Sequence, residues 1–198
     1  MTSPLHHHPP FGEATSIYDY WFQNDGEANM AKWFTKSRDF DGEIRTKFSD
    51  ALHEAEQGKC LHWIMSKESY VAHIVLLDQF SRQIYRGTGQ SFANDLSALT
   101  FAKMGMKSYY PTLNKYEKMF VLMPSMHSEN VEAQIKCVAH VQNEPDDDPF
   151  WTNVLRHAQG HRDVVLRFGR FPKRNAALGR ESSEEELKYM EDTPDLPY

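Results

Sequence analysis

The residues best suited to chemistry lie in a basic segment near the C-terminus, residues 161–175, with the sequence HRDVVLRFGRFPKRN. Its Arg and Lys side chains stand out in a chain of formal net charge −6. Arg offers a planar fork of donors and stays charged at every relevant pH, so it suits a carboxylate or a phosphate. The pattern predicts a helix through Phe168, a left-handed end at Gly169, and no immediate restart before Pro172. We therefore expect a helix end followed by a basic turn that binds an anion.

A second group of polar side chains interrupts the apolar run of residues 76–86. Asp78, Arg82 and Arg86 are spaced four apart, so a regular helix places them on one face, with Gln79 beside them. Two interpretations stay open. The group is a surface ion pair worth less than about 1 kcal/mol, or it is the floor of a polar pocket in which Asp78 orients Arg82 and leaves Arg86 for a ligand.

A third group is formed by His127 and Glu129, together with His161 from the basic segment. Pro124 is expected to disrupt a helix just before them. An imidazole beside a carboxylate has the residue types of a metal site and of an acid–base pair. The sequence contains no known metal-binding, phosphate-binding or nucleophile motif, so we predict no metal site and assign no cofactor. The alternative is that His127 is a hydrogen-bonded structural residue.

Composition limits the classes of protein. The chain has 198 residues, of which 40% are hydrophobic and 25% charged, as in ordinary globular proteins. Its acidic balance argues against a general nucleic-acid or anionic-membrane surface, and no apolar run approaches the about 20 residues of a membrane span. Cys60 and Cys137 are far apart and lie in apolar stretches, which favours buried, inert thiols in a reducing compartment. Without a secretory signal pattern, the sequence predicts a cytoplasmic protein.

Helical spacing of apolar residues dominates the chain, and no segment alternates as a half-buried strand does. Helical runs are expected to start near Thr15, Phe40, Ser66, Phe92, Tyr116, Val131, Phe150 and Ser182. Asp41 and Ser66 are the predicted N-caps of the second and third runs. The predicted fold class is all-α, built from antiparallel helix pairs with short connections. A loose arm (1–13), in which His6, His7 and His8 form a solvated tail, precedes a single domain (14–192) and a tail (193–198).

These motifs together resemble the uncharacterised domain-of-unknown-function 924 family, from about Ile17 to Met190. The resemblance rests on YWF (20–22), WF (33–34), FD (40–41), LLDQFSR (76–82), RGT (86–88), MPSMHSE (123–129) and the segment 161–175. The chain departs from the family where Ser81 replaces a usual Pro and where Ser125 and Met126 replace Phe-Glu. The resemblance implies an all-helical fold of tetratricopeptide-like helix pairs, brings no established reaction, and places the polar candidates on family motifs.

Two functions of different classes follow from these residues. The first is a pocket for a small anionic molecule, fitting hydrolase or lyase chemistry on a carboxylated or phosphorylated metabolite. Its candidate catalytic residues are Asp78, His127, Glu129 and His161. Its candidate ligand-binding residues are Gln79, Arg82, Arg86, Arg162, Arg167, Arg170, Arg174 and Asn175. The second function is a scaffold whose basic turn holds an acidic peptide of a protein partner.

A third interpretation is that the polar motifs form an internal ion-pair network that fixes the helices in register. The pocket is favoured because the six arginines of the motifs outnumber the nearby acids Asp78, Glu129 and Asp163. In neither function do we expect nucleic acid or a membrane as a partner.

Overall fold

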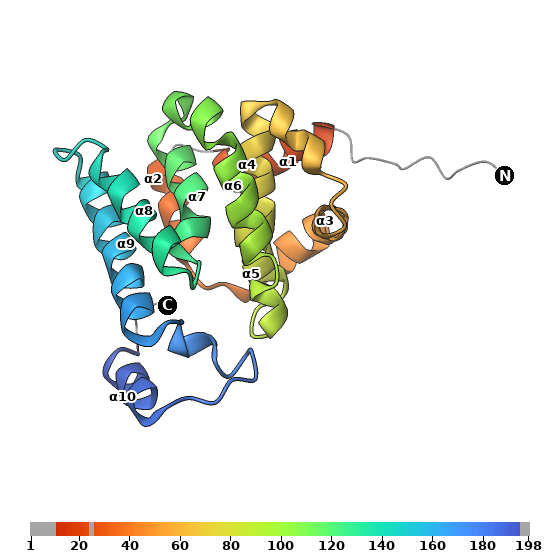
Figure 1. Ribbon diagram of the computed structural model, residues 1–198. Coiled ribbons are helices and arrows are strands. Elements are labelled where there is room, and N and C mark those ends of the chain that lie inside the picture. Colours follow the sequence, from red (N-terminus) through yellow and green to blue (C-terminus); the bar gives the residue numbers. More distant parts are fainter. Residues whose placement is uncertain (1–10, 24–25, 195–198) are drawn as a thin grey trace. The chain divides into compact units, whose positions relative to one another are not determined.

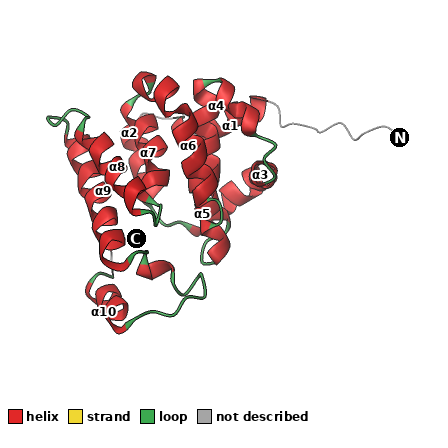
Figure 2. Cartoon of the chain, viewed as in Figure 1, coloured by secondary structure: helices red, strands yellow, loops and turns green. Residues whose placement is uncertain are grey.

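The computed structural model describes residues 11–23 and 26–194, and these residues contain helices and no strand (Figure 2). The predicted all-α class is thus confirmed. The histidines His6–His8 of the predicted arm lie outside the described residues. The chain divides into two compact units, the first comprising Met1–Arg86 with Gln90–Val121 and the second Gly87–Gly89 with Leu122–Tyr198. The single domain expected for residues 14–192 stays a prediction.

The first unit is built from helices joined by short turns (Figure 1). They are α1 (Phe11–Phe22), α2 (Gly26–Phe34), α3 (Arg38–Glu56), α4 (Lys67–Val75), a π-helical turn (Leu76–Phe80), α5 (Ser81–Ile84), α6 (Asp95–Tyr109) and the start of α7 (Lys115–Met126). Turns of 3-10 helix occupy Leu61–Met65, Gly89–Phe92 and Tyr110–Thr112.

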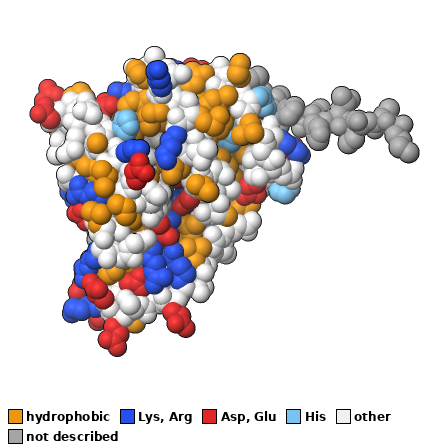
Figure 3. All heavy atoms as spheres, viewed as in Figure 1, with side chains coloured by type: hydrophobic (Ala, Val, Ile, Leu, Met, Phe, Trp, Pro, Cys, Tyr) orange, Lys and Arg blue, Asp and Glu red, His pale blue; other side chains and the backbone are white. Residues whose placement is uncertain are grey.

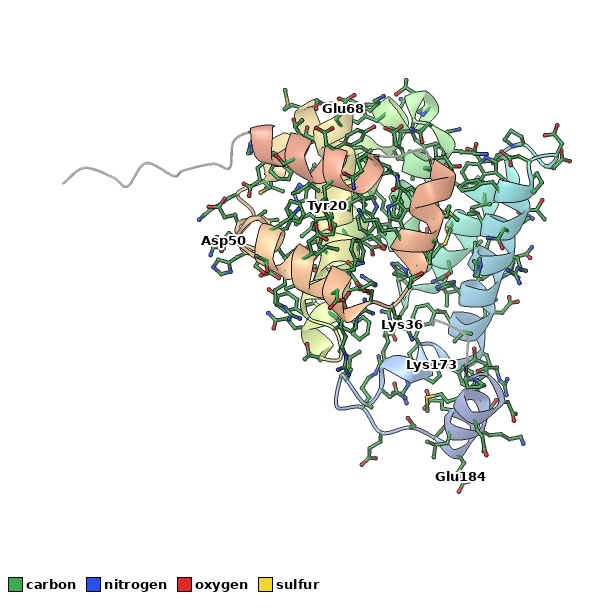
Figure 4. All side chains as sticks on the ribbon, turned by 180° about the vertical axis from the view of Figure 1, so that it is seen from behind. Tyr20, Lys36, Asp50, Glu68, Lys173 and Glu184 are labelled. Carbon is green, nitrogen blue, oxygen red and sulfur yellow. The ribbon has the colours of Figure 1, made fainter. Side chains whose placement is uncertain are left out.

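Aromatic rings form the centre of this unit. The Trp21 ring lies 5.3 Å from that of Phe80 and 5.5 Å from that of Phe120, and Trp33 lies 4.8 Å from Phe120. The indole N–H of Trp33 also donates to the Trp21 carbonyl at 3.0 Å. Tyr20 lies between α1 and α3 (Figure 4). Edge-on aromatic pairs of this kind add to the burial of large apolar area, so this cluster joins α1, α2, the π-helical turn and α7.

α4 and α6 pack closely because α6 carries a glycine at the contact. The Tyr70 ring is fully buried and its hydroxyl donates to the Ala102 carbonyl at 2.5 Å. A Cβ atom at Gly105 would overlap this ring. Gly105 therefore allows the two helices to approach at this point.

Several helix ends in the first unit follow the sequence signals, and others differ. The Ser66 hydroxyl caps α4 by accepting from the Ser69 N–H at 3.2 Å, as predicted. The prediction that Asp41 caps α3 was wrong, because Ser37 caps it and Asp41 lies buried in its first turn. α1 begins at Phe11, so residues 11–13 of the predicted arm are helical. α2 was not predicted.

The second unit contains the end of α7, α8 (Val131–Gln142), α9 (Pro149–Phe168), a 3-10 turn (Pro172–Arg174) and α10 (Glu184–Asp192). α8 and α9 lie side by side, joined by the acidic loop (Figure 1). Val164, Val165 and Phe171 form a small core against which Phe168 and Tyr189 pack.

The helix ends of the second unit agree well with the sequence. Asp148 caps α9 by accepting from the Phe150 N–H at 2.9 Å, and α9 ends at Gly169 with φ 69°, in the left-handed conformation expected there. α10 starts with a capping box formed by Ser183 and Glu186. The expected break at Pro124 is displaced, because α7 runs through this proline to Met126. A missing N–H removes one hydrogen bond, which the packed helix tolerates.

Candidate functional site

The predicted polar group of residues 76–86 is centred on the π-helical turn. In this turn the Ser81 N–H donates to the Leu76 carbonyl five residues earlier. The turn buries Asp78 to 1% exposure and Gln79 to 7%, and the Gln79 amide donates to Asp78 Oδ2 at 2.6 Å. π-helical turns are rare and frequently occur at functional sites. Here the turn places a carboxylate and an amide inside the first unit.

Arg82 is held between two carboxylates. Its Nη1 lies 3.3 Å from Asp78 Oδ1 and donates to the Asp78 carbonyl at 2.5 Å, while its Nη2 donates to Asp95 Oδ1 at 2.9 Å. Burial lowers the pKa of Arg82, but Asp78 and Asp95 outweigh it and raise that pKa overall. This geometry is a partly buried ion network rather than an exposed pair.

Arg86, the residue that the pocket interpretation assigned to a ligand, does not share one regular helix face with Asp78 and Arg82. α5 ends at Ile84, so the regular helix needed for that geometry stops short of Arg86. The Arg86 guanidinium instead pairs with Asp41 of α3, with Nη2 at 2.7 Å from Oδ1. This hydrogen bond raises the pKa of Arg86.

In the second unit, His161 and Arg174 lie against one aromatic ring, and His127 is next to both of them. The His127 and His161 rings have centroids 6.0 Å apart, and His161 meets the Phe171 ring edge-on at 5.7 Å. The Arg174 guanidinium lies over the same ring, 4.5 Å from its centroid, and its Nη2 donates to the His127 carbonyl at 2.9 Å. We call His127, His161, Phe171 and Arg174 the His–Arg cluster.

His161 is the most strongly perturbed member of this cluster. Its side chain belongs to a residue only 8% exposed, and its Nδ1 lies 2.8 Å from the His157 carbonyl. Because a carbonyl only accepts, the neutral ring carries its proton on Nδ1 and has its lone pair on Nε2. Burial, followed by the positive charge of His127, lowers the pKa of His161 to about 3, and Arg174 contributes in the same direction. The ring is therefore neutral near pH 7.

Glu129 has partners that the sequence interpretation did not include. The Arg180 guanidinium donates to both of its oxygens, at 2.7 and 2.9 Å, and the Phe171 N–H donates to Oε1 at 2.8 Å. Burial raises the pKa of Glu129, but the hydrogen bonds from Arg180 and Phe171 lower it overall. Glu129 thus fixes the backbone beneath the His–Arg cluster. Arg180 was missed because it lies outside the 161–175 segment.

The remaining predicted ligand-binding residues of the second unit form ion pairs and hydrogen bonds with other residues of the same unit. Arg162 pairs with Asp163, Arg167 with Glu185, and Arg170 with Glu186, at 2.7, 2.8 and 2.7 Å. The Asn175 amide donates to Ser182 at 3.0 Å and to Glu186 at 3.3 Å. The hydrogen bond from Arg170 lowers the pKa of Glu186 to about 2. The count of arginines against nearby acids omitted Asp41, Asp95, Glu185 and Glu186, which are distant in sequence.

Other features add no second candidate. Within residues 11–23 and 26–194, no group of three or more His, Cys, Asp or Glu side chains is arranged to hold a metal ion. A surface depression of about 430 Å³ is lined by Asp147, Pro149, Thr152, Asn153 and Arg156, none of them a predicted site residue. Both cysteines are buried, and burial raises the pKa of each thiol to about 12, which agrees with inert thiols. None of the described helices is long and apolar enough to cross a membrane.

The helices and the polar motifs together define a class of all-helical proteins. The chain belongs to the family described as bacterial protein of unknown function (DUF924), whose model matches residues 17–194. A solved structure of similar fold is the protein of unknown function ATU0120 from Agrobacterium tumefaciens. It is 33% identical, the match covers 92% of this chain and 98% of that one, and the TM-score is 0.83. No curated protein sequence matches the chain.

Proposed function

We propose that the second unit binds a small anionic molecule, a carboxylate or a phosphate, at the His–Arg cluster. The observation that carries this proposal is that His161 and the Arg174 guanidinium both lie against the Phe171 ring, with the His127 ring 6.0 Å from that of His161. A guanidinium against an aromatic face keeps its edge donors directed in one plane. Such a plane matches the oxygens of a carboxylate or phosphate.

The electrostatics of the cluster support the same ligand class. Positive neighbours disfavour a further proton on His161, which is one reason for its low pKa. A bound anion would reverse this balance and raise the pKa of both imidazoles. With a pKa of about 3 His161 is a weak base, and it can act as the proton acceptor of the cluster only when a bound anion raises that pKa towards neutrality. Proton abstraction from a bound carboxylate- or phosphate-bearing substrate is the chemistry that fits, as in a hydrolase or a lyase.

The other candidate residues take supporting roles in this proposal. Glu129 and Arg180 hold the Phe171 backbone, and Arg170, Asn175 and Glu186 fix the segment that follows. The polar residues of the first unit stabilise its fold through ion pairs and hydrogen bonds; they are Asp78, Gln79, Arg82 and Arg86. The ligand therefore depends on far fewer arginines than the sequence suggested.

The test is a thermal-shift and calorimetric screen with inorganic phosphate, pyrophosphate, and mono- and dicarboxylates. The full chain is compared with Arg174→Gln, which removes the charge over Phe171, and with Arg162→Gln, which removes an equal charge paired with Asp163. A ligand at one hundred times its dissociation constant adds about 2.7 kcal/mol of stability. We expect a shift in wild type and Arg162→Gln that disappears in Arg174→Gln. Equal shifts in all three proteins, or none in any, would refute the proposal.

A nuclear magnetic resonance titration separates binding from general stabilisation. The imidazole signals of His127 and His161 are followed against pH with and without the anion that gave the shift. Binding at the cluster raises both pKa values, because the charged imidazole gains an opposite charge. Unchanged titration of both rings in the presence of a stabilising anion would place its site elsewhere.

A further inference from the structure

The outward face of α6 combines apolar and basic side chains. Leu96 is 75% exposed and Met104 58%, although both are large hydrophobic residues. Lys103 and Lys107 are exposed on the same side of the helix, opposite the buried residues of α6. On the face of the first unit that Figure 3 shows, hydrophobic side chains reach the surface over the region of α4 and α6.

No acid balances this face. The sole acidic residue of α6 is Asp95, which is bound to Arg82. In the described part of the chain, neither Lys103 nor Lys107 forms an ion pair within 4.0 Å. An exposed apolar stripe with unpaired charge of one sign indicates an interaction surface. The charge is unusual in a chain of net charge −6.

The outward face of α10 is mainly acidic, and its one lysine, Lys188, lies 3.9 Å from Asp192. Leu187 is 55% exposed and lies between Glu184 and Glu191, three residues before and four residues after it. Neither of these two acids forms an ion pair within the residues that the structure describes. Figure 4 shows Glu184 at the start of α10, directed away from the ribbon. The opposite face of α10 packs against the second unit, since Glu186 on that face is only 3% exposed.

We propose that α10 of one chain docks on the α6 face of a second copy. Leu187 packs against Leu96 and Met104, and the two acids of α10 pair with the two lysines of α6. At about 1.5 Å per residue, the acids are about 10 Å apart along α10 and the lysines about 6 Å apart along α6. Long lysine stems cover the difference and add apolar contact of their own.

A second copy is favoured over a lipid surface for two reasons. The net charge of −6 opposes approach of the whole molecule to an anionic membrane. The α10 face supplies both the apolar anchor and the acids that the α6 face needs. Each copy offers α6 to one contact and α10 to another, so every chain can take part in the contact twice.

The test is a charge exchange followed by analytical ultracentrifugation across a range of protein concentrations. One variant carries Lys103→Glu with Lys107→Glu, and the other carries Glu184→Lys with Glu191→Lys. Each variant alone places like charges in the contact, so we expect the self-association constant to fall at least tenfold. Mixed in equal amounts, the two variants offer complementary charges in both contacts, and we expect association to return.

A matched control reverses two exposed lysines elsewhere, Lys36→Glu with Lys136→Glu, and should associate like wild type. Circular dichroism verifies that each variant is folded. A wild-type chain that is monomeric at every concentration would overturn the proposal, as would a dimer unaffected by charge reversal or a mixture that does not reassociate. Binding of wild-type monomer to phosphatidylserine vesicles, lost in the lysine variant, would assign the face to a lipid surface instead.

Discussion

Acidification should destabilise this protein through two buried histidines, His161 and His73. Burial is the main reason that the folded-state pKa is about 3 for His161 and about 4 for His73, against 6.5 in an unfolded chain. Between these values the unfolded chain binds protons that the folded chain does not. The free energy of unfolding therefore falls as the pH falls, by about 2 kcal/mol for each histidine from about pH 7 to about pH 5.

The groups around each ring explain why the proton is excluded. His161 faces His127, His157 and Arg174, all of which act against its protonation electrostatically, although its hydrogen bond to the His157 carbonyl acts in favour. His73 has its ring centroid 4.0 Å from that of Phe101, and the charge of His62 adds to the effect of burial. A hydrogen bond to the Cys60 backbone opposes these effects without cancelling them.

Guanidinium unfolding followed by tryptophan fluorescence measures this loss at several pH values. His161→Gln removes one titrating group, so its loss of stability over the interval should be about 2 kcal/mol smaller than that of wild type. His53→Gln is the control for the loss of an imidazole, because the His53 side chain is 69% exposed. An equal pH dependence in His161→Gln and wild type would refute the reasoning.

Three further predictions concern packing, charge and capping. Gly105→Ala should lower the free energy of unfolding by about 1–3 kcal/mol, because the new methyl group overlaps the buried Tyr70 ring. Gly42→Ala lies in open space on α3 and should raise the free energy of unfolding by about 0.5–1 kcal/mol in the same denaturation assay. Arg82→Met should cost about 3–5 kcal/mol, since it leaves the buried carboxylate of Asp78 without its cation; a thermal-denaturation loss below about 1 kcal/mol would show that the network is weak. Ser183→Ala should cost α10 about 1 kcal/mol, seen as faster amide exchange in that helix and unchanged exchange in α9.

Local signals predicted much of the secondary structure because they act within one turn of chain. Ser66 caps α4 as predicted, α9 and α10 start close to the predicted Phe150 and Ser182, and Gly169 ends α9. The cap of α3 was predicted wrongly because Ser37 and Asp41 are both suitable cap residues and lie close together, and Ser37 is the cap. A cap is decided by one local hydrogen bond, so the error displaced the start of α3 by a few residues only.

The candidate site was harder to predict because its partners come from distant segments. The sequence grouped His127 with Glu129 and His161, and it did not indicate that His161 and Arg174 both lie against Phe171, because that contact depends on the tertiary fold. Arg180 reaches Glu129 across 51 positions of sequence, and no spacing rule covers that separation. A comparison with neighbouring acids alone therefore omitted the partners of four arginines, which are Arg82, Arg86, Arg167 and Arg170.

The π-helical turn of Leu76–Phe80 makes this stretch sensitive to chain length as well as to residue type. A π-helical turn contains an extra residue compared with an α-helical one, and each residue of an α-helix advances the side chains by about 100°. Deleting one residue here would convert the turn to regular helix. The side chains after the deletion would then rotate relative to those before it, so Arg82 could no longer contact Asp78 and Asp95 together. The ion network of the first unit thus depends on the length of this turn, and a chain shortened by one residue here would need a different set of buried charges.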